Sequence, residues 1–169
     1  MPAEPALPLA YLCLGANLGD RAGTMAQALA ALEAAGLVVT ARSSLYETPP
    51  WGPIPQPSYL NQVAAVLSPF DPHALLDLAL KVERRLGRDR SREVRFGPRA
   101  IDIDILLFAK ETVATPGLVL PHPRLLERAF ALVPLLEIAP EITVGGMPAR
   151  DALARLDASG VERIGPSRA

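Results

Sequence analysis

Apolar and polar positions alternate along the first two thirds of the chain in a way that predicts both strands and helices. Four apolar segments have the length and composition of strands: residues 9–15, 38–46, 59–67 and 99–108. Two stretches between them have helical spacing instead. The first stripe is Met25, Leu29 and Leu32, and the second is Leu75, Ala79, Val82 and Leu86.

Local signals mark where these two helices begin and end. Asp20 is suited to cap the first helix, and Asp71 followed by Pro72 is a strong start for the second. Gly36 and Gly87 are natural stops. The order β-α-β-β-α-β is the split pattern of a ferredoxin-like α+β fold, an antiparallel sheet with helices packed on its faces.

The last third of the chain predicts shorter additions to this frame. They are an extended piece at 118–120, a helix over 125–138 that Pro134 kinks, a short hairpin or strand after residue 141 and a helix over 149–156. No linker or internal repeat divides the chain. We therefore expect one domain over residues 1–169, frayed at 1–8 and at about 160–169.

Composition narrows the classes of function. Half of the 169 residues are hydrophobic, 21% are charged and the formal net charge is −1, as in a soluble globular protein without a global field for a polyanion. The single cysteine, Cys13, excludes an internal disulfide and a cysteine-rich zinc site. The first residues show neither a signal peptide nor a membrane span. We expect a cytoplasmic protein with no nucleic-acid or membrane partner.

The fourth predicted strand carries two aspartates. If it alternates regularly, Ile101, Ile103, Ile105 and Leu107 share one face, and Asp102, Asp104, Leu106 and Phe108 share the other. Carboxylates about 6–7 Å apart beside apolar residues repel each other unless a cation joins them, and Mg²⁺ prefers such oxygen ligands. The alternative is a half-exposed strand with ordinary surface acids.

An arginine-rich loop precedes this strand. Its basic residues are Arg88, Arg90, Arg92, Arg95 and Arg99. Guanidinium groups bind phosphate oxygens in two-point contacts, so a loop of this kind beside paired aspartates indicates a site for polyphosphate and metal. A solvated loop in an arginine-rich protein is the competing interpretation.

Two further segments supply candidate binding groups. Residues 47–61 hold a proline-stiffened loop with Trp51, followed by Tyr59 and Asn61, which could stack on and hydrogen-bond a flat heterocycle. Trp51 could equally cap the core. Between two prolines, His122 has a restricted backbone and could reach a phosphate, or could simply be exposed.

These residues exclude one class of enzyme and leave two alternative functions open. The chain has no Gly-x-x-x-x-Gly-Lys sequence, which excludes a P-loop kinase. A nucleotidyltransferase that uses the paired aspartates, and a non-catalytic ferredoxin-like module for a small ligand or RNA, remain alternatives.

Taken in order, these segments resemble the 6-hydroxymethyl-7,8-dihydropterin pyrophosphokinases of folate biosynthesis. The matching pieces are LGANLG at 14–19, ETPPWG at 47–52, YLN at 59–61, Glu83 with Gly87 and Arg88, FGPRAIDID at 96–104, PHPR at 121–124 and RAF at 128–130. They lie between positions 14 and 140. Ala16 stands where the family usually has Ser, and Phe96 where it often has Trp.

The resemblance implies a monomeric, ATP-dependent diphosphotransferase. Asp102 and Asp104 would hold two Mg²⁺ ions, and together with Arg88 and Arg99 they would be catalytic. The implied ATP-binding residues are Glu83, Arg90, Phe96, Ile105, His122 and Arg128. The implied pterin-binding residues are Thr48, Pro49, Trp51, Tyr59, Asn61 and Phe130. Pyrophosphate would pass from ATP to the pterin hydroxymethyl group, and AMP would leave.

Overall fold

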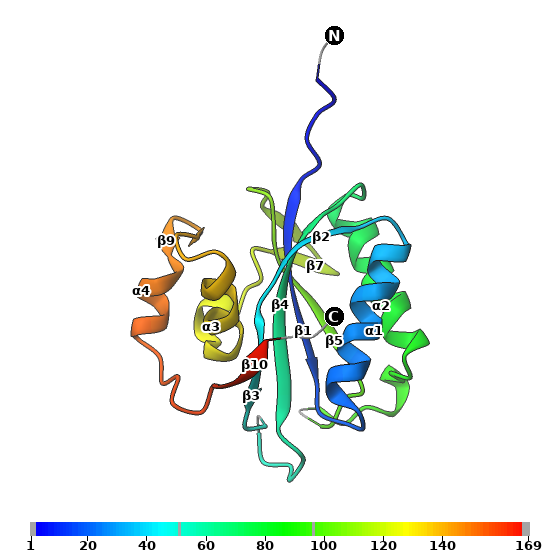
Figure 1. The fold of residues 1–169 in the computed structure, drawn as a ribbon, viewed down its shortest axis with the longest axis vertical. Helices are drawn as coiled ribbons and strands as arrows, with labels where there is room; N and C mark the ends of the chain where they lie inside the picture. Colours follow the sequence, from blue (N-terminus) through cyan, green and yellow to red (C-terminus); the bar gives the residue numbers. More distant parts are fainter. Residues whose placement is uncertain (1–2, 51, 96, 167–169) are drawn as a thin grey trace.

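The central element of the fold is an antiparallel sheet (Figure 1). The computed structural model describes residues 3–50, 52–95 and 97–166. Within them the strands of this sheet are β1 (Leu9–Ala16), β2 (Val38–Arg42), β3 (Ser44–Thr48), β4 (Tyr59–Leu67), β5 (Asp102–Phe108) and β10 (Glu162–Pro166). The order across the sheet is β10-β3-β4-β1-β5, with β2 also paired to β4. The path from β1 to β5 confirms the predicted ferredoxin-like connection.

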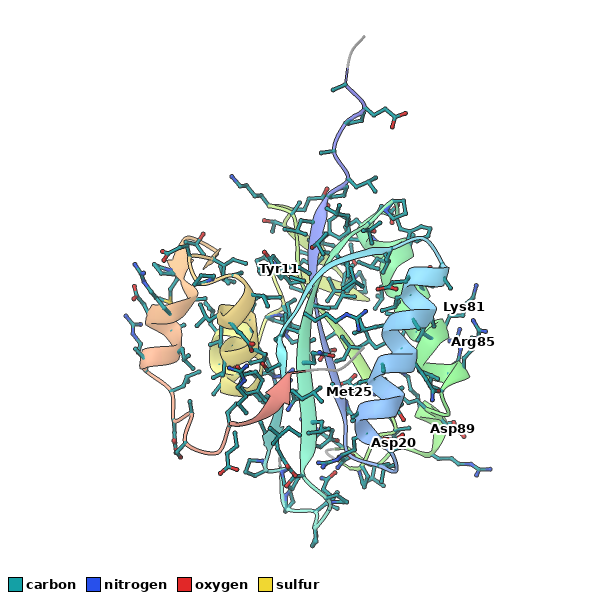
Figure 2. All side chains as sticks on the ribbon, viewed as in Figure 1. Tyr11, Asp20, Met25, Lys81, Arg85 and Asp89 are labelled. Atoms are coloured by element: carbon teal, nitrogen blue, oxygen red, sulfur yellow. The ribbon has the colours of Figure 1, made fainter. Side chains whose placement is uncertain are left out.

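Helices cover both faces of the sheet (Figure 1). On one face lie α1 (Arg21–Ala34) and α2 (Pro72–Arg85), and on the other lie α3 (Ala129–Ile138) and α4 (Ala149–Ala154). Met25 of α1 is buried against the sheet, whereas Lys81 and Arg85 of α2 point outward (Figure 2). A separate apolar core lies between the sheet and the helices on each of its two faces. None of the helices in the described ranges is long and apolar enough to cross a membrane.

The two long helices begin and end at the predicted residues. The Asp20 side chain accepts a hydrogen bond from the Gly23 amide, and the Asp71 side chain accepts one from the Ala74 amide. Gly36 and Gly87 follow the helices with φ of 120° and 100°, a region that favours glycine. These boundaries depend on neighbouring residues alone, which is why the sequence pattern predicts them.

The second predicted strand is interrupted in the structure. Residues 38–46 divide into β2 and β3 at Ser43, whose backbone amide donates to Val63 and whose hydroxyl donates to the Ser44 carbonyl. The structure therefore replaces one long strand by two shorter ones that both pair with β4.

A β-bulge in β5 corrects the predicted alternation of its side chains. Leu12 of β1 pairs with Ile105, but Tyr11 pairs with Leu107, so Leu106 has no opposite residue in β1. Leu106 and Leu107 consequently both enter the core beside α3.

Beyond the bulge, the prediction was wrong for two residues. Phe108 lies in the α1/α2 core instead of sharing a face with the aspartates, and Leu107 has left the face of Ile103 and Ile105. The strand also begins at Asp102 rather than at Arg99. Asp102 and Asp104 precede the bulge and keep the predicted common face.

Shorter elements complete the chain. They are the 3₁₀ turns η1 (Arg90–Arg92) and η2 (Leu125–Glu127) and the hairpins β6 (Val113–Thr115) with β7 (Leu118–Leu120) and β8 (Thr143–Val144) with β9 (Met147–Pro148). The predicted helix over 125–138 divides into η2 and α3, and α3 retains Pro134. Part of the predicted frayed tail forms β10, which pairs with β3.

Candidate active site

A cavity of about 210 Å³ opens beside the last residue of β3, the first residues of β4 and β5 and the first turn of α3. Its lining residues come from five parts of the chain: Cys13, Gly15, Thr48, Pro49, Tyr59, Asn61, Gly97, Arg99, Asp102, Asp104, Arg124, Glu127, Arg128 and Phe130. The paired aspartates therefore share one cavity with most of the residues expected to hold a pterin. This convergence depends on strand pairing between segments far apart in the sequence.

The two aspartates form an acidic pair that suits a divalent cation. Burial by surrounding protein atoms and the neighbouring charge of Asp102 raise the pKa of Asp104 above its ordinary value, even though 33% of its side chain is still exposed. A cation would relieve this repulsion. No group of three or more His, Cys, Asp or Glu side chains suited to a metal occurs in the described ranges. The pair would thus supply part of a Mg²⁺ shell that water and phosphate oxygens complete.

Arginines neutralise this pair in the structure. Asp102 Oδ1 accepts from Arg88 Nη1 at 2.7 Å, and its Oδ2 accepts from Arg99 Nη1 at 3.2 Å. Asp104 Oδ2 lies 3.8 Å from Arg128 Nη1. Each of the two carboxylates accordingly has an arginine guanidinium in the place where a bound metal ion would otherwise balance its charge.

Arg88 belongs to a buried ion-pair network and does not line the cavity. Only 2% of its side chain is exposed, and the guanidinium contacts Glu83 and Glu93 in addition to Asp102. Burial alone would lower the pKa of Arg88, but the hydrogen bonds and charges of these three carboxylates outweigh it and raise that pKa. The network holds Arg88 against the acidic pair from outside the cavity.

Glu83 connects this network to the edge of the sheet. Its Oε2 accepts from Arg88 Nη1 at 2.7 Å and from the Ile103 amide at 3.1 Å, and its Oε1 accepts from Arg90 Nη2 at 2.8 Å. The residue is 1% exposed. It therefore ties the end of α2 to β5. The ATP-binding role that the family resemblance implies for Glu83 stays a prediction.

The wall opposite α3 carries an ordered polar pair. Asn61 Nδ2 donates to Thr48 Oγ1 at 2.8 Å, and both residues are buried. A Cβ added at Gly15 would lie 3.0 Å from Asn61 Oδ1, so the absence of a side chain there leaves room for this amide. The Tyr59 hydroxyl donates to the Gly97 carbonyl at 3.1 Å and so joins this wall to the arginine-rich loop.

The other wall begins at α3. Phe130 faces the cavity from the first turn, and the Arg128 guanidinium lies 5.5 Å from the centre of its ring. Aromatic surfaces of Tyr59 and Phe130 thus line the same cavity as the polar pair. Trp51 and Phe96, also predicted at the site, lie outside the described residues.

Four of the predicted ATP-binding residues that the structure describes do not line the cavity: Glu83 and Arg90, which belong to the ion-pair network, and Ile105 and His122. The Ile105 side chain is buried in the α1/α2 core, on the face opposite the aspartates. The backbone amide of His122 donates to Leu106, and its ring Nδ1 accepts from the Arg124 amide at 3.1 Å. Burial, assisted by the charge of Arg128, lowers the pKa of His122 to about 4, so its ring is neutral at pH 7.

The structure adds site residues that sequence reasoning did not single out. Asn17 is 1% exposed; its Nδ2 donates to Gln56 Oε1 at 2.8 Å and to the Pro57 carbonyl at 3.0 Å, and its Oδ1 accepts from the Arg99 amide at 2.8 Å. It joins the proline-stiffened loop to the arginine-rich loop. Its place in the LGANLG motif was the available signal. Cys13, Gly15, Arg124 and Glu127 also line the cavity without having been predicted.

A split β-α-β-β-α-β sheet with an acidic pair and converging arginines is typical of an enzyme that handles phosphate groups with metal assistance. Residues 11–140 match the sequence model of a protein family, 7,8-dihydro-6-hydroxymethylpterin-pyrophosphokinase (HPPK). The chain belongs to this family. It is therefore an enzyme, a pyrophosphokinase of folate biosynthesis that acts on small molecules. The alternative of a non-catalytic module is excluded.

Relatives support this assignment at high coverage. The chain is 50% identical over 156 residues to a 2-amino-4-hydroxy-6-hydroxymethyldihydropteridine pyrophosphokinase of Methylorubrum extorquens, covering 92% of this chain and 98% of the relative. It is 45% identical over 135 residues to the protein of that name from Bacillus subtilis, covering 79% and 80%.

A solved structure supports the fold. A crystal structure described as HPPK-DHPS in complex with substrates superposes with a TM-score of 0.70 at 15% identity, covering 89% of this chain and 43% of that one. The present chain thus spans less than half of that protein, and at this identity the likeness concerns the fold alone.

Proposed function

We propose that the enzyme transfers pyrophosphate from ATP to the hydroxymethyl group of 6-hydroxymethyl-7,8-dihydropterin and releases AMP, with two Mg²⁺ ions at Asp102 and Asp104. The observation that carries the proposal is the single cavity in which these aspartates face Asn61, Tyr59 and Phe130. As the family resemblance implies, we further propose a monomer that works in the cytoplasm on these two small molecules.

Two walls of the cavity together suit the pterin. Tyr59 on one wall and Phe130 on the α3 wall offer aromatic surfaces on which a flat bicyclic ring can stack. Asn61 and Thr48 offer buried amide and hydroxyl groups to the polar edge of the ring. A nucleotidyltransferase would not require these groups, which is why the pterin reaction is favoured.

The acidic pair and the arginines suit the transfer step. The hydroxymethyl oxygen attacks the β-phosphorus of ATP and its proton is released to water. The bond from that phosphorus to the oxygen of the α-phosphate breaks, and AMP leaves with the electron pair on that oxygen. Bound Mg²⁺ supplies charge neutralisation on the phosphate oxygens. With a cation held by Asp102 and Asp104, Arg99 and Arg128 would be released from these carboxylates and would be able to bind phosphate oxygens, which would position the donor.

The test is a product assay. The protein is incubated with ATP, Mg²⁺ and the pterin, and nucleotides are separated by chromatography. AMP that appears only with the pterin supports the proposal. ADP would indicate transfer of a single phosphate, and absence of any nucleotide product would overturn the proposal. The same assay compares Asp102→Asn and Asp104→Asn with Asp77→Asn, an exposed substitution on α2 that serves as their control.

A further inference from the structure

Glu137, near the end of α3, is bound by three groups of β3. Its carboxylate accepts from the Ser44 amide at 3.0 and 3.1 Å, from the Ser44 hydroxyl at 2.7 Å and from the Tyr46 hydroxyl at 2.6 Å. Burial alone would raise the pKa of Glu137, but the hydrogen bonds from Tyr46 and Ser44 outweigh it and lower that pKa. This tie joins segments 93 residues apart for Ser44 and 91 for Tyr46.

Both elements joined by this tie continue into the cavity. Ser44, Tyr46 and Thr48 are alternate residues of β3, all buried, so they share one face of the strand. Glu137 follows Phe130 by seven residues in α3, which places the two side chains on the same helical face, about 10 Å apart along the axis. The Glu137 tie and the cavity therefore lie in the same layer between α3 and β3.

The helix between Phe130 and Glu137 gives a further reason for such a tie. Pro134 has no backbone N–H and cannot donate to the carbonyl four residues earlier, so α3 is a weaker rod than a helix without proline. The position of its first turn then depends more on side-chain contacts with the sheet. Glu137 supplies a polar contact that fixes both the distance and the register of α3 along β3.

We propose that Glu137, held by Ser44 and Tyr46, is a positioning residue for the acceptor substrate: it sets the width of the slot between Phe130 and the Thr48–Asn61 wall to that of a flat bicyclic ring. This inference rests on the proposed function. Loosening the tie widens the slot and weakens stacking in the ground state and in the transition state alike. The KM for the pterin should then rise while kcat stays nearly constant.

The experiment compares substitutions in the tie with a matched surface change. The variants are Glu137→Ala, Tyr46→Phe, the double variant, Glu137→Gln and the control Glu141→Ala. Glu141 pairs with Arg150 at 3.3 Å, and its side chain is 79% exposed. Calorimetry measures the Kd for 6-hydroxymethyl-7,8-dihydropterin alone and with Mg²⁺ and a non-hydrolysable ATP analogue, at a temperature where circular dichroism shows every variant folded.

We expect a graded loss of pterin affinity. Glu137→Ala should raise the pterin Kd about 10-fold and Tyr46→Phe about 3-fold, because the latter removes one of the hydrogen bonds. The double variant should be no worse than Glu137→Ala, since Tyr46 acts through Glu137. Glu137→Gln, which keeps an acceptor oxygen, should recover part of the affinity. Binding of the ATP analogue and the Glu141→Ala control should stay unchanged.

Two outcomes overturn the inference by itself. One is a folded Glu137→Ala or Tyr46→Phe variant that binds the pterin like the wild type. The other is an equal loss of affinity for pterin and ATP analogue, which indicates a general structural effect. If Glu137→Ala does not fold, Tyr46→Phe removes only a hydroxyl and still decides the matter. A wild-type protein that binds no pterin would instead overturn the proposed function, and this inference with it.

Discussion

Replacing Glu83 by alanine should destabilise the protein strongly, whether or not Glu83 also has the ATP-binding role that the family resemblance implies. The carboxylate is 1% exposed and accepts hydrogen bonds from Arg88, Arg90 and the Ile103 amide. Breaking a buried ion pair costs about 3–5 kcal/mol, because the remaining charge loses its partner. Arg88 keeps Asp102 and Glu93, which favours the lower end of that range.

The expected change is therefore about 3 kcal/mol in the free energy of unfolding. For a chain of this length, each kcal/mol lowers Tm by roughly 2–4 °C, so Tm should fall by about 6–12 °C. Urea unfolding followed by circular dichroism gives the free energy, and a thermal scan gives Tm. The solvent-exposed Arg90 contributes little to this figure, since 54% of its side chain faces water.

Glu33→Ala is the matched control for this measurement. Glu33 also lies near the end of a helix and pairs with an arginine, Arg42, at 3.2 Å, but 43% of its side chain is exposed. Its loss should cost less than about 0.5 kcal/mol. Equal stabilities for the Glu83 and Glu33 variants would refute the reasoning. An unchanged unfolding curve with a raised KM for ATP alone would show that Glu83 acts on the nucleotide and not on stability.

Three further predictions concern the cavity and the tie beside it. Asn substitutions at Asp102 or Asp104 should lower kcat by about 10²–10³-fold with an unchanged circular-dichroism spectrum; near-full activity would contradict the metal assignment. Gly15→Ala places a Cβ 3.0 Å from Asn61 Oδ1 and should raise the KM for the pterin several-fold; an unaltered KM would show that the Asn61 amide does not depend on this space. The lowered pKa of Glu137 means that its hydrogen bonds stabilise the fold above the ordinary carboxyl pKa of about 4.5 and that this stability is lost as pH falls through the lower folded value. Urea unfolding of Glu137→Gln between about pH 5 and pH 3 should thus show a shallower pH dependence than the wild type, and parallel curves would argue against the shift.

The sequence by itself determined the features that depend on near neighbours. Helix starts at Asp20 and Asp71 and stops at Gly36 and Gly87 need only a few adjacent residues, and the structure has them where they were predicted. The apolar strand segments and their order among the helices were enough to predict the ferredoxin-like fold, because few topologies satisfy that order. The common face of Asp102 and Asp104 also followed from strand periodicity over three residues.

Only the tertiary structure decided how distant segments complete the site. The bulge at Leu106 reverses the alternation of side chains in β5. Because the bulge arises from the pairing of β5 with β1, the sequence near Leu106 carries no local signal for it. The strand β10 likewise forms because β3 offers it an edge. Glu83, Asn17 and Glu137 are single polar residues whose partners lie 20 to 93 residues away for the contacts that define their roles. Burial makes such residues find hydrogen-bond partners, but which partners they find is decided by the packing of the whole chain.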